Sequence, residues 1–508
     1  MGKIELRGYQ KAAVQAVVDE INNGAKRPFL VVEPCGAGKS YEIAGFIDAL
    51  SKDNPEFKMI VITPSAELVM QDYTAVTNVI GEKDVGIDSR MVERQELDKK
   101  ITITNINTIY KDYKYFEKVD LIIIDEAHQI KQNDTKSSSM YRAVESYFRS
   151  LNPNLCIVGL TATPHRLSEG LIYGVDKFFS HIVHETKFST LTIGGFLSPL
   201  YCHLPNFKTD FSHAKTNFIG EFTSDVWKLI DTDQAIAFLV QRAEKKKKVL
   251  IFATSLEQAE LIKHKLKEAT GEYVGLITSD TPTLQRKNEL GRFCSLTAED
   301  KIKYMVNVMV LKQGFDNPAI DMVVLFRPTR STALYVQMCC RGSRKSPVTR
   351  KTKCEILDFG GNIERHGFID DVEYKTGKEG PVENSHCYKV CPECGALNST
   401  KAEYCSECNH MFEHHPRKLA TMFELNTKFN ILSDKCNINN YPIDEYDQDG
   451  NLINTYPNIP EAAKLSGEQV ENIMFALDLI KQYPGVIKPI NNWFFSIKNG
   501  QHINSQVS

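Results

Sequence analysis

The sequence has almost no excess of charge of either sign, because 64 Asp and Glu residues balance 61 Lys and Arg residues and leave a net charge of -3. This excludes a protein that binds polyanions through bulk positive charge, so any nucleic-acid surface must be a local basic stripe. The chain also lacks a run of about 18 apolar residues and an apolar segment at its N-terminus. We therefore expect no membrane span and no signal peptide.

The cysteines do not form the framework of a disulfide-rich protein. There are 13 of them, an odd number, and four stand in two closely spaced C-x-x-C pairs. This pattern indicates a reducing compartment and one metal site, so we expect a cytoplasmic protein. The composition, 42% hydrophobic and 25% charged, excludes disorder, collagen-like repeats and a coiled coil as descriptions of the whole chain. The length of 508 residues predicts about three or four domains.

Two series of short apolar runs alternate with helical patterns and predict two parallel sheets in an α/β fold. The first series occupies residues 29–32, 59–62, 101–103, 121–124 and 156–160. The second occupies residues 249–252, 274–277, 304–308, 322–326 and 354–358. The expected divisions are a first lobe at 1–195, a connecting segment at 196–234, a second lobe at 235–370, a linker at 371–385, a cysteine-rich module at 386–415 and a C-terminal module at 440–508.

A strand, a loop with two glycines and a helix start follow one another over residues 30–40. Backbone N–H groups of such a loop cradle phosphate oxygens, Lys39 can reach the β- and γ-phosphates, and Ser40 can hold Mg²⁺. The strict phosphate-loop pattern has Gly where this chain has Glu33, so an ordinary Gly-rich turn remains an alternative. The expected nucleotide contacts in the loop are Gly36, Ala37, Gly38, Lys39 and Ser40.

Two acidic residues follow the apolar strand at 121–124. An acid at the carboxyl end of a parallel strand points into the crevice where ligands bind. Asp125 can therefore hold the metal, and Glu126 can take a proton from an attacking water. Acidic pairs at strand ends are commonly solvated loops, but the apolar strand and the phosphate loop upstream favour a nucleotide site.

With these elements in place, the chain resembles the superfamily 2 helicases over about residues 5–365. The first lobe carries sequences similar to the family's motifs in their usual order. They are the adenine-reading segment at 6–10, motif I at the phosphate loop, motif Ia at 63–65, motif Ib at 104–105, motif II (Asp-Glu-Ala-His) at 125–128 and motif III at 161–164. The second lobe resembles motif IV at 251–255, motif V at 314–318 and motif VI at 337–344, where Cys340 replaces the usual Gly.

The resemblance implies two RecA-like lobes that bind ATP and Mg²⁺ between them. It implies ATP contacts from Arg7, Gln10, Gly314 and Asp316, and catalytic roles for Lys39, Asp125, Glu126, Arg341 and Arg344. The two arginines would donate to the γ-phosphate in the manner of arginine fingers, although a basic surface turn is the simpler interpretation of the same sequence. Coupling between motifs would fall to His128, Thr161, Thr163 and Gln337. Contacts to nucleic-acid phosphates would fall to Thr63, Thr104 and Thr254, although Thr at a strand end is commonly a helix N-cap.

The two cysteine pairs are Cys391 with Cys394 and Cys405 with Cys408. Each C-x-x-C places two thiolates on one tight turn, and four thiolates close a tetrahedral Zn²⁺ site with no open position for catalysis. A redox pair is the alternative, but it normally shows a single C-x-x-C. Residues 356–362 and 365–367 resemble the segment that follows motif VI in the bacterial and phage members of this helicase group. A zinc ribbon often follows that segment in those proteins.

Residues 446–453 predict two short strands around an Asp-Gly turn, followed by two helices and a closing strand at 493–495. This arrangement resembles the helix-turn-helix repeat appended to homing endonucleases, which would imply DNA contact. The second helix carries Glu471 and Asp478, which would repel phosphates. Contact with a protein partner therefore remains the alternative.

The leading hypothesis is an ATP-dependent DNA helicase or translocase of the repair and recombination branch, of the UvsW type, in a prokaryote or a phage-infected host. An RNA helicase is the nearest alternative. A non-hydrolysing, ATP-gated scaffold is disfavoured because the expected catalytic residues are all present. A nuclease fused to a motor is disfavoured because the sequence shows no convincing nuclease metal cluster.

Overall fold

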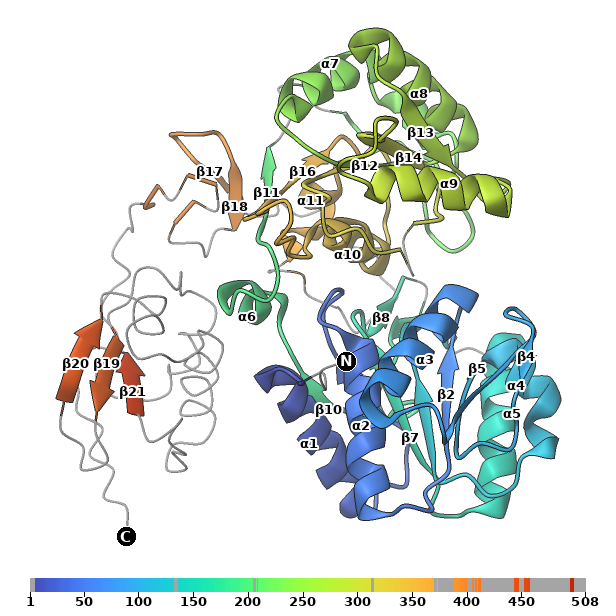
Figure 1. Ribbon diagram of the computed structural model, residues 1–508. Helices are drawn as coiled ribbons and strands as arrows, with labels where there is room; N and C mark the ends of the chain where they lie inside the picture. Colours follow the sequence, from blue (N-terminus) through green and yellow to red (C-terminus); the bar gives the residue numbers. More distant parts are fainter. Residues whose placement is uncertain are drawn as a thin grey trace.

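The computed structural model describes residues 5–131, 136–167, 169–203, 207, 209–311, 315–369, 372, 388–399, 404, 405, 407, 408, 410–412, 443–446, 452–456 and 494–497. Two α/β lobes lie one above the other in Figure 1, with the segment that contains α6 (Phe188–Ile193) running between them. Within the described ranges, no helix is both long and apolar enough to cross a membrane. The fold is the predicted one, with two lobes built on largely parallel sheets.

The first lobe is built on an eight-stranded sheet in the order β10-β1-β7-β6-β2-β5-β3-β4. All neighbouring pairs are parallel except β3 with β4. The strands are β1 (Phe29–Val32), β2 (Met59–Thr63), β3 (Val85–Ser89), β4 (Arg94–Gln95), β5 (Ile101–Asn105), β6 (Leu121–Ile124), β7 (Cys156–Thr161) and β10 (Ile182–Glu185). A separate hairpin pairs β8 (His165–Arg166) with β9 (Gly170–Leu171).

Helices cover both faces of this sheet, which explains why its strands are continuous apolar runs. Along β1, Phe29 and Val31 pack into one core and Leu30 packs into the core on the opposite face. The first core also receives α1 (Gly8–Asn22), α2 (Lys39–Asp53) and α3 (Ala66–Ile80). The second receives α4 (Ile106–Asp112) and α5 (Lys136–Leu151). Single 3₁₀ turns occur at η1 (Tyr113–Tyr115) and η2 (Ala127–Gln129).

The second lobe is built on an eight-stranded sheet in the order β13-β14-β12-β15-β16-β11-β18-β17. Its predicted strands are β12 (Val249–Phe252), β13 (Val274–Ile277), β14 (Tyr304–Asn307), β15 (Met322–Leu325) and β16 (Cys354–Asp358). Its helical elements are η3 (Val226–Leu229), α7 (Thr232–Ala243), α8 (Leu256–Thr270), α9 (Thr283–Cys294), α10 (Thr332–Cys339), η4 (Cys340–Gly342) and α11 (Asn362–His366). Alternate residues of β12 again face opposite cores, with Leu250 on one side and Ile251 on the other.

Three strands of the second sheet come from outside the predicted lobe. β11 (Leu200–His203) lies in the predicted connecting segment and pairs in parallel with β16. β17 (Tyr388–Val390) and β18 (Leu397–Ser399) lie in the predicted cysteine-rich module, and β18 pairs antiparallel with β11. Figure 1 shows these two strands at the outer edge of the sheet beside β11. The cysteine-rich module is therefore an extension of the second sheet.

The C-terminal module contributes a three-stranded antiparallel sheet, in the order β20-β19-β21. Its strands are β19 (Ile443–Tyr446), β20 (Leu452–Tyr456) and β21 (Phe494–Ile497). They match the strands expected around the Asp-Gly turn and at the end of the module. The two predicted helices between β20 and β21 lie outside the described residues, as does the predicted linker except for Val372.

Candidate active site

The phosphate loop lies between β1 and α2 and depends on two glycines. Gly36 and Gly38 have φ of 88° and 93°, a left-handed conformation that side chains with a Cβ rarely adopt. A Cβ on Gly38 would also lie 2.8 Å from Gln10 Nε2. Gly38 caps α2, so the free N–H groups and the positive end of the helix dipole point at the loop. These are the features that bind a phosphate.

The predicted adenine-reading segment is fixed directly to the phosphate loop. Gln10 Nε2 donates to Ala37 O at 3.1 Å, and Tyr9 Oη donates to the same carbonyl. The Arg7 backbone N–H donates to Gln10 Oε1 at 3.0 Å, which orients the amide. Any displacement of this segment must therefore move the loop that holds the phosphates.

The two acidic residues after β6 lie beside the loop lysine. Lys39 Nζ is 3.5 Å from Glu126 Oε1, and both side chains are nearly buried. Asp125 Oδ1 accepts from the Glu126 backbone N–H at 2.8 Å. Glu126 itself has φ of 50°, which is uncommon for a residue other than Gly and is typical of strained functional sites. The structure thus brings Lys39, Asp125 and Glu126 together as predicted.

The pKa values of the two carboxyl groups are shifted in opposite directions. Burial would raise the pKa of Glu126, but the Lys39 ammonium and the His128 ring outweigh it and hold that pKa below its usual value. Burial, followed by the charge of Glu126, raises the pKa of Asp125 to about 7. Such a divided pair is typical of catalytic carboxylates.

The four predicted coupling residues form one chain of contacts between the lobes. His128 Nδ1 is 3.0 Å from Thr161 Oγ1, and Thr161 Oγ1 also accepts from the Thr163 backbone N–H at 3.0 Å. On the other side of the ring, Gln337 Nε2 of the second lobe lies 3.1 Å from His128 Nε2. An amide nitrogen can only donate, so His128 Nε2 accepts and Nδ1 carries the proton in this arrangement. The network therefore links motifs II, III and VI.

The two predicted arginine fingers are both held by the 315–316 loop. Arg341 Nη1 donates to Phe315 O at 2.5 Å, and Arg344 forms an ion pair with Asp316. Burial lowers the pKa of Arg344. Asp316, predicted as an ATP contact, is therefore in this structure the partner of an arginine. Gly314 lies outside the described residues.

The expected Mg²⁺ position has a suitable donor set. Ser40 and Asp125 are nearly buried and supply a hydroxyl and a carboxylate oxygen, which are hard ligands that Mg²⁺ prefers. Ser40 Oγ accepts from Gln71 Nε2 at 2.8 Å. Gln71 lies on α3, six residues after Ser65 of motif Ia, and was not predicted from the sequence. Its amide orients the hydroxyl that would hold the metal.

Glu33, the departure from the strict phosphate-loop pattern, is buried under the loop. Its Oε1 accepts from Thr186 Oγ1 at 2.6 Å, at the end of β10. Burial raises the pKa of Glu33 to about 8. The side chain therefore ties the loop to the edge of the sheet at β10.

None of the three threonines predicted to contact nucleic acid has a fully exposed side chain. Thr63 and Thr104 are buried, and their hydroxyls donate to Ser65 O at 3.5 Å and Asn105 O at 3.3 Å. Neither side chain presents a surface to a polymer, so this geometry does not support direct phosphate contact. Thr254 is half-buried, and its hydroxyl has no hydrogen-bond partner among the described residues. Their neighbours Ser65, Asn105 and Ser255 cap the following helices.

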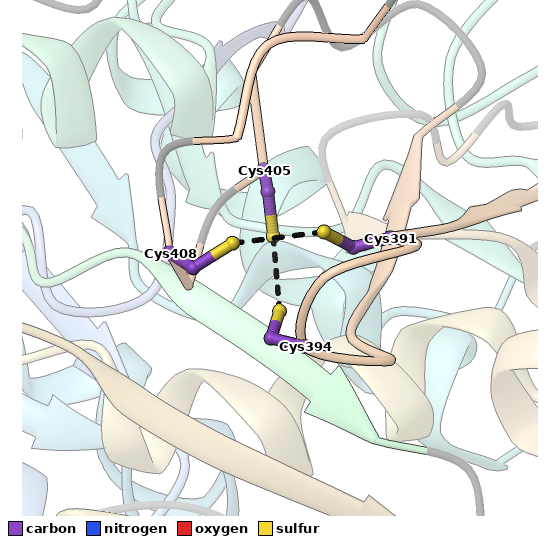
Figure 2. A group of neighbouring side chains, drawn as sticks. All are labelled: Cys391, Cys394, Cys405 and Cys408. Atoms are coloured by element: carbon purple, nitrogen blue, oxygen red, sulfur yellow. Dashed lines mark hydrogen bonds between the residues drawn. The ribbon is translucent and has the colours of Figure 1, made fainter.

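The four predicted metal-binding cysteines converge on one point, as Figure 2 shows. Cys391 Sγ lies 3.6 Å from Cys408 Sγ, and Cys394 Sγ lies 3.5 Å from Cys405 Sγ. Zn–S bonds of about 2.3 Å in a tetrahedron place sulfurs about 3.8 Å apart, so these separations suit a Zn²⁺ ion. Gly395, directly after the first pair, has φ of 73° and closes the turn.

A buried ionic network joins this cluster to the second lobe. His203 at the end of β11 lies 3.1 Å from Cys394 O and 2.8 Å from Glu407 Oε2. Lys353 Nζ donates to Glu407 O at 2.6 Å. Arg242 Nη2 lies 3.9 Å from Glu407 Oε1 and 2.6 Å from Glu355 Oε1. The cysteine cluster is thus anchored by side chains of three lobe segments.

Comparisons with known proteins agree with this geometry. Residues 3–166 match the family described as "Type III restriction enzyme, res subunit", and residues 230–346 match the "Helicase conserved C-terminal domain". The chain is 26% identical over 377 residues to IRC3 of Saccharomyces cerevisiae, whose name describes an ATP-dependent helicase. This alignment covers 70% of the chain and 51% of that protein, so the chain spans about half the length of that relative.

Two further similarities each cover most of the chain. A 51.5 kDa protein of a Lactococcus phage is 25% identical over 422 residues, which cover 80% of the chain and 85% of that protein. The solved structure of the Type ISP restriction-modification enzyme LlaBIII bound to DNA matches with a TM-score of 0.52 and 16% identity, covering 70% of the chain and 28% of that enzyme. The latter likeness concerns the fold.

The fold and the site define a two-lobed P-loop ATPase with its nucleotide site between the lobes. The chain belongs to the superfamily 2 helicases, a class of ATP-hydrolysing enzymes, with a restriction-enzyme-type first lobe and a helicase C-terminal second lobe.

Proposed function

We propose that the chain is an ATP-driven DNA translocase or helicase. The observation that carries the proposal is the continuous contact path from Lys39 and Glu126 through His128 to Gln337, which joins the hydrolytic residues of one lobe to the other lobe. DNA is favoured over RNA by the restriction-enzyme family of the first lobe and by the DNA-bound enzyme that shares the fold.

In the proposed reaction, the loop N–H groups and Lys39 bind the phosphates, and Glu126 accepts the proton of the attacking water. A γ-phosphate bound to Lys39 would take the place of the Lys39–Glu126 contact, which is 3.5 Å in this structure. The pKa of Glu126 would then rise towards a value better suited to a general base. Ser40 and Asp125 would hold Mg²⁺, and the bound ion would offset the negative charge of the phosphates.

Motion follows from the dependence of lobe closure on the γ-phosphate. Arg341 and Arg344 sit on the second lobe, and Arg344 is close to the loop glycine, because a Cβ added to Gly36 would lie 3.5 Å from Arg344 Cγ. If the two arginines exchanged their contacts with residues 315–316 for contacts with the γ-phosphate, the two lobes would be held closer together. Hydrolysis would remove the γ-phosphate and let the lobes separate.

The test is to measure ATP hydrolysis with single-stranded DNA, duplex DNA, forked DNA and RNA in parallel, with Glu126→Gln as the inactive control. We expect stimulation by at least one form of DNA. Equal rates with and without every polymer would remove the motor function, and stimulation by RNA alone would favour an RNA helicase.

We also propose that the cysteine cluster holds structural Zn²⁺. The test is the zinc content of Cys391→Ser beside that of Cys294→Ser, because Cys294 is a free, exposed thiol away from the cluster. We expect one zinc ion per chain in the wild type and the control, and none in Cys391→Ser. Equal zinc in all three would exclude the site.

For the C-terminal module we propose substrate choice through DNA or a protein partner, as in the homing-endonuclease repeat that it resembles. Its acidic residues keep protein contact open. Removal of residues 440–508 should leave basal ATP hydrolysis intact, and any change in DNA affinity would distinguish the two kinds of partner.

A further inference from the structure

A three-residue segment, Phe196, Leu197 and Ser198, contacts three separate parts of the ATP site. It follows α6 and precedes β11, so it lies at the passage between the lobes. Its start is fixed because Phe196 N and Leu197 N both donate to Leu191 O, at 2.8 and 3.0 Å. No motif of the superfamily that the sequence resembles includes it.

The first contact is with the adenine-reading segment. The Phe196 ring packs edge-on against Tyr9, with ring centroids 5.0 Å apart and an interplanar angle of 66°. The Arg7 guanidinium lies 5.2 Å from the centroid of the same ring, within the range of a cation–π interaction. Phe196 therefore contacts two residues, Arg7 and Tyr9, that precede Gln10 in this segment.

The second contact is with the phosphate loop. Leu197 is almost fully buried and packs in one core with Cys35 and Ala37 of the loop. A Cβ on Gly36 would lie 3.2 Å from Leu197 Cδ2, so the glycine and the leucine are in close contact. A densely packed contact of this kind transmits a displacement, because it leaves no space in which to absorb it.

The third contact is with the arginine-bearing turn of the second lobe. Leu197 and Arg344 form an antiparallel bridge, and Ser198 N donates to Ser343 O at 2.5 Å. Ser198 Oγ lies 3.4 Å from Arg344 O. The backbone that carries Arg344 is thus hydrogen-bonded to the residues directly after Phe196.

We infer that the 196–198 segment couples recognition of the adenine base to the placement of Arg344, with Phe196 as the positioning residue. A base that engages Arg7 and Gln10 fixes Phe196, and the two following residues fix the backbone of the arginine. A nucleotide with a different base would bind through its phosphates but leave Arg344 less well placed. The segment would then make the rate of hydrolysis, and not only binding, selective for ATP. This inference rests on the proposed ATP hydrolysis.

The test is steady-state hydrolysis of ATP and GTP by the wild type, Phe196→Ala and Gln10→Ala, and by the double variant. For ATP, we expect Phe196→Ala to lower kcat about tenfold while KM changes less than about threefold, because the phosphates still bind. For GTP, the same substitution should change kcat by less than about twofold. The double variant should resemble either single variant, because both interrupt one path.

Three controls separate positioning from damage to the fold. Phe196→Tyr keeps the ring and should retain near wild-type kcat. Phe196→Leu keeps apolar volume without the ring, and it should match Phe196→Ala in kcat while unfolding at the wild-type temperature. Tyr115→Ala removes an exposed ring of the first lobe and should change nothing.

Two results would overturn the inference. One is an equal rise in KM for ATP and GTP with kcat unchanged in Phe196→Ala. The other is a double variant whose loss is the product of the two single losses. A wild-type chain without ATP hydrolysis would instead remove the proposed function, so the two failures are distinguishable.

Discussion

Buried carboxylates of the two lobes differ greatly in how many hydrogen-bond and ion-pair partners they have. Under the phosphate loop, Glu33 and Glu42 are fully buried, and neither oxygen of Glu42 has a hydrogen-bond partner within the described ranges. On β16 of the second sheet, Glu355 is equally buried but accepts from Tyr201 Oη at 3.2 Å and Arg242 Nε at 2.7 Å, and Lys246 Nζ lies 2.8 Å away.

The pKa directions follow this difference. Burial, and then the charge of Glu33, raise the pKa of Glu42 well above its usual value. Burial would raise the pKa of Glu355 too, but the His203 hydrogen bond and the Lys246 and Arg242 charges outweigh it and lower that pKa to about 2. A fully hydrogen-bonded ionic network stabilises the fold, whereas buried carboxyl groups with strongly raised pKa values next to a phosphate loop are typical of a functional site.

The largest expected effect tests Glu126, whose pKa is held below its usual value in the nucleotide site. Glu126→Gln removes the proton acceptor while keeping the shape of the side chain. Hydrolysis of ATP should fall about 10²–10⁴-fold, because that is the usual contribution of a positioned general base. Nucleotide affinity should be preserved, as measured with a fluorescent nucleotide.

A matched change at Asp53, an exposed acid on α2, provides the control. Asp53→Asn should hydrolyse ATP at the wild-type rate. Equal loss in both variants would mean that the assay reports charge near α2 and not catalysis by Glu126.

The next largest effect is on stability in the second lobe. Glu355→Gln leaves Arg242, Lys246 and His203 without their buried counter-charge. We expect a loss of about 3 kcal/mol at pH 7, since removing one partner of a buried ion pair is strongly destabilising. Denaturant unfolding followed by a probe in the second lobe measures it.

The pH dependence of this effect has a definite sign. The pKa of Glu355 is lowered to about 2 from an ordinary value of 4.5, so its stabilisation is complete above pH 4.5 and disappears as pH falls towards 2. The difference between wild type and Glu355→Gln should shrink over the same range. Glu268→Gln, at an exposed ion pair with His264, should show little effect at any pH.

The contrast between the two lobes also shows what the sequence can predict. The strands Phe29–Val32 and Leu121–Ile124 and the loop at Lys39 were predictable because their patterns are local: an apolar run followed by Gly, Lys or acids. The meeting of Lys39 with Glu126 then follows from the shared edge of a parallel sheet. The convergence of the four cysteines was predictable from spacing alone.

Other features depend on pairing over long distances. β10 and β11 are four-residue strands of mixed polarity, and only their neighbours β1 and β16 make them strands. The docking of β18 on β11 and the Gln71–Ser40 contact have no periodic signal either. Burial of Thr63 and Thr104 was missed because a hydroxyl at a strand end can face solvent or its own backbone equally well in sequence terms.

The smallest expected effect has the opposite sign to that of Glu355. Because the pKa of Glu42 is raised well above 4.5, the folded protein binds the proton more tightly than the unfolded chain does. Its ionisation therefore costs stability as pH rises beyond 4.5. Glu42→Gln mimics the protonated acid and removes that cost, so we expect it to be more stable than wild type by about 1 kcal/mol at pH 8. The gain should vanish near pH 4.5, as thermal unfolding at both pH values would show. A variant that is less stable at both pH values would mean that the Glu42 carboxylate is satisfied, and the contrast between the two lobes would then fail.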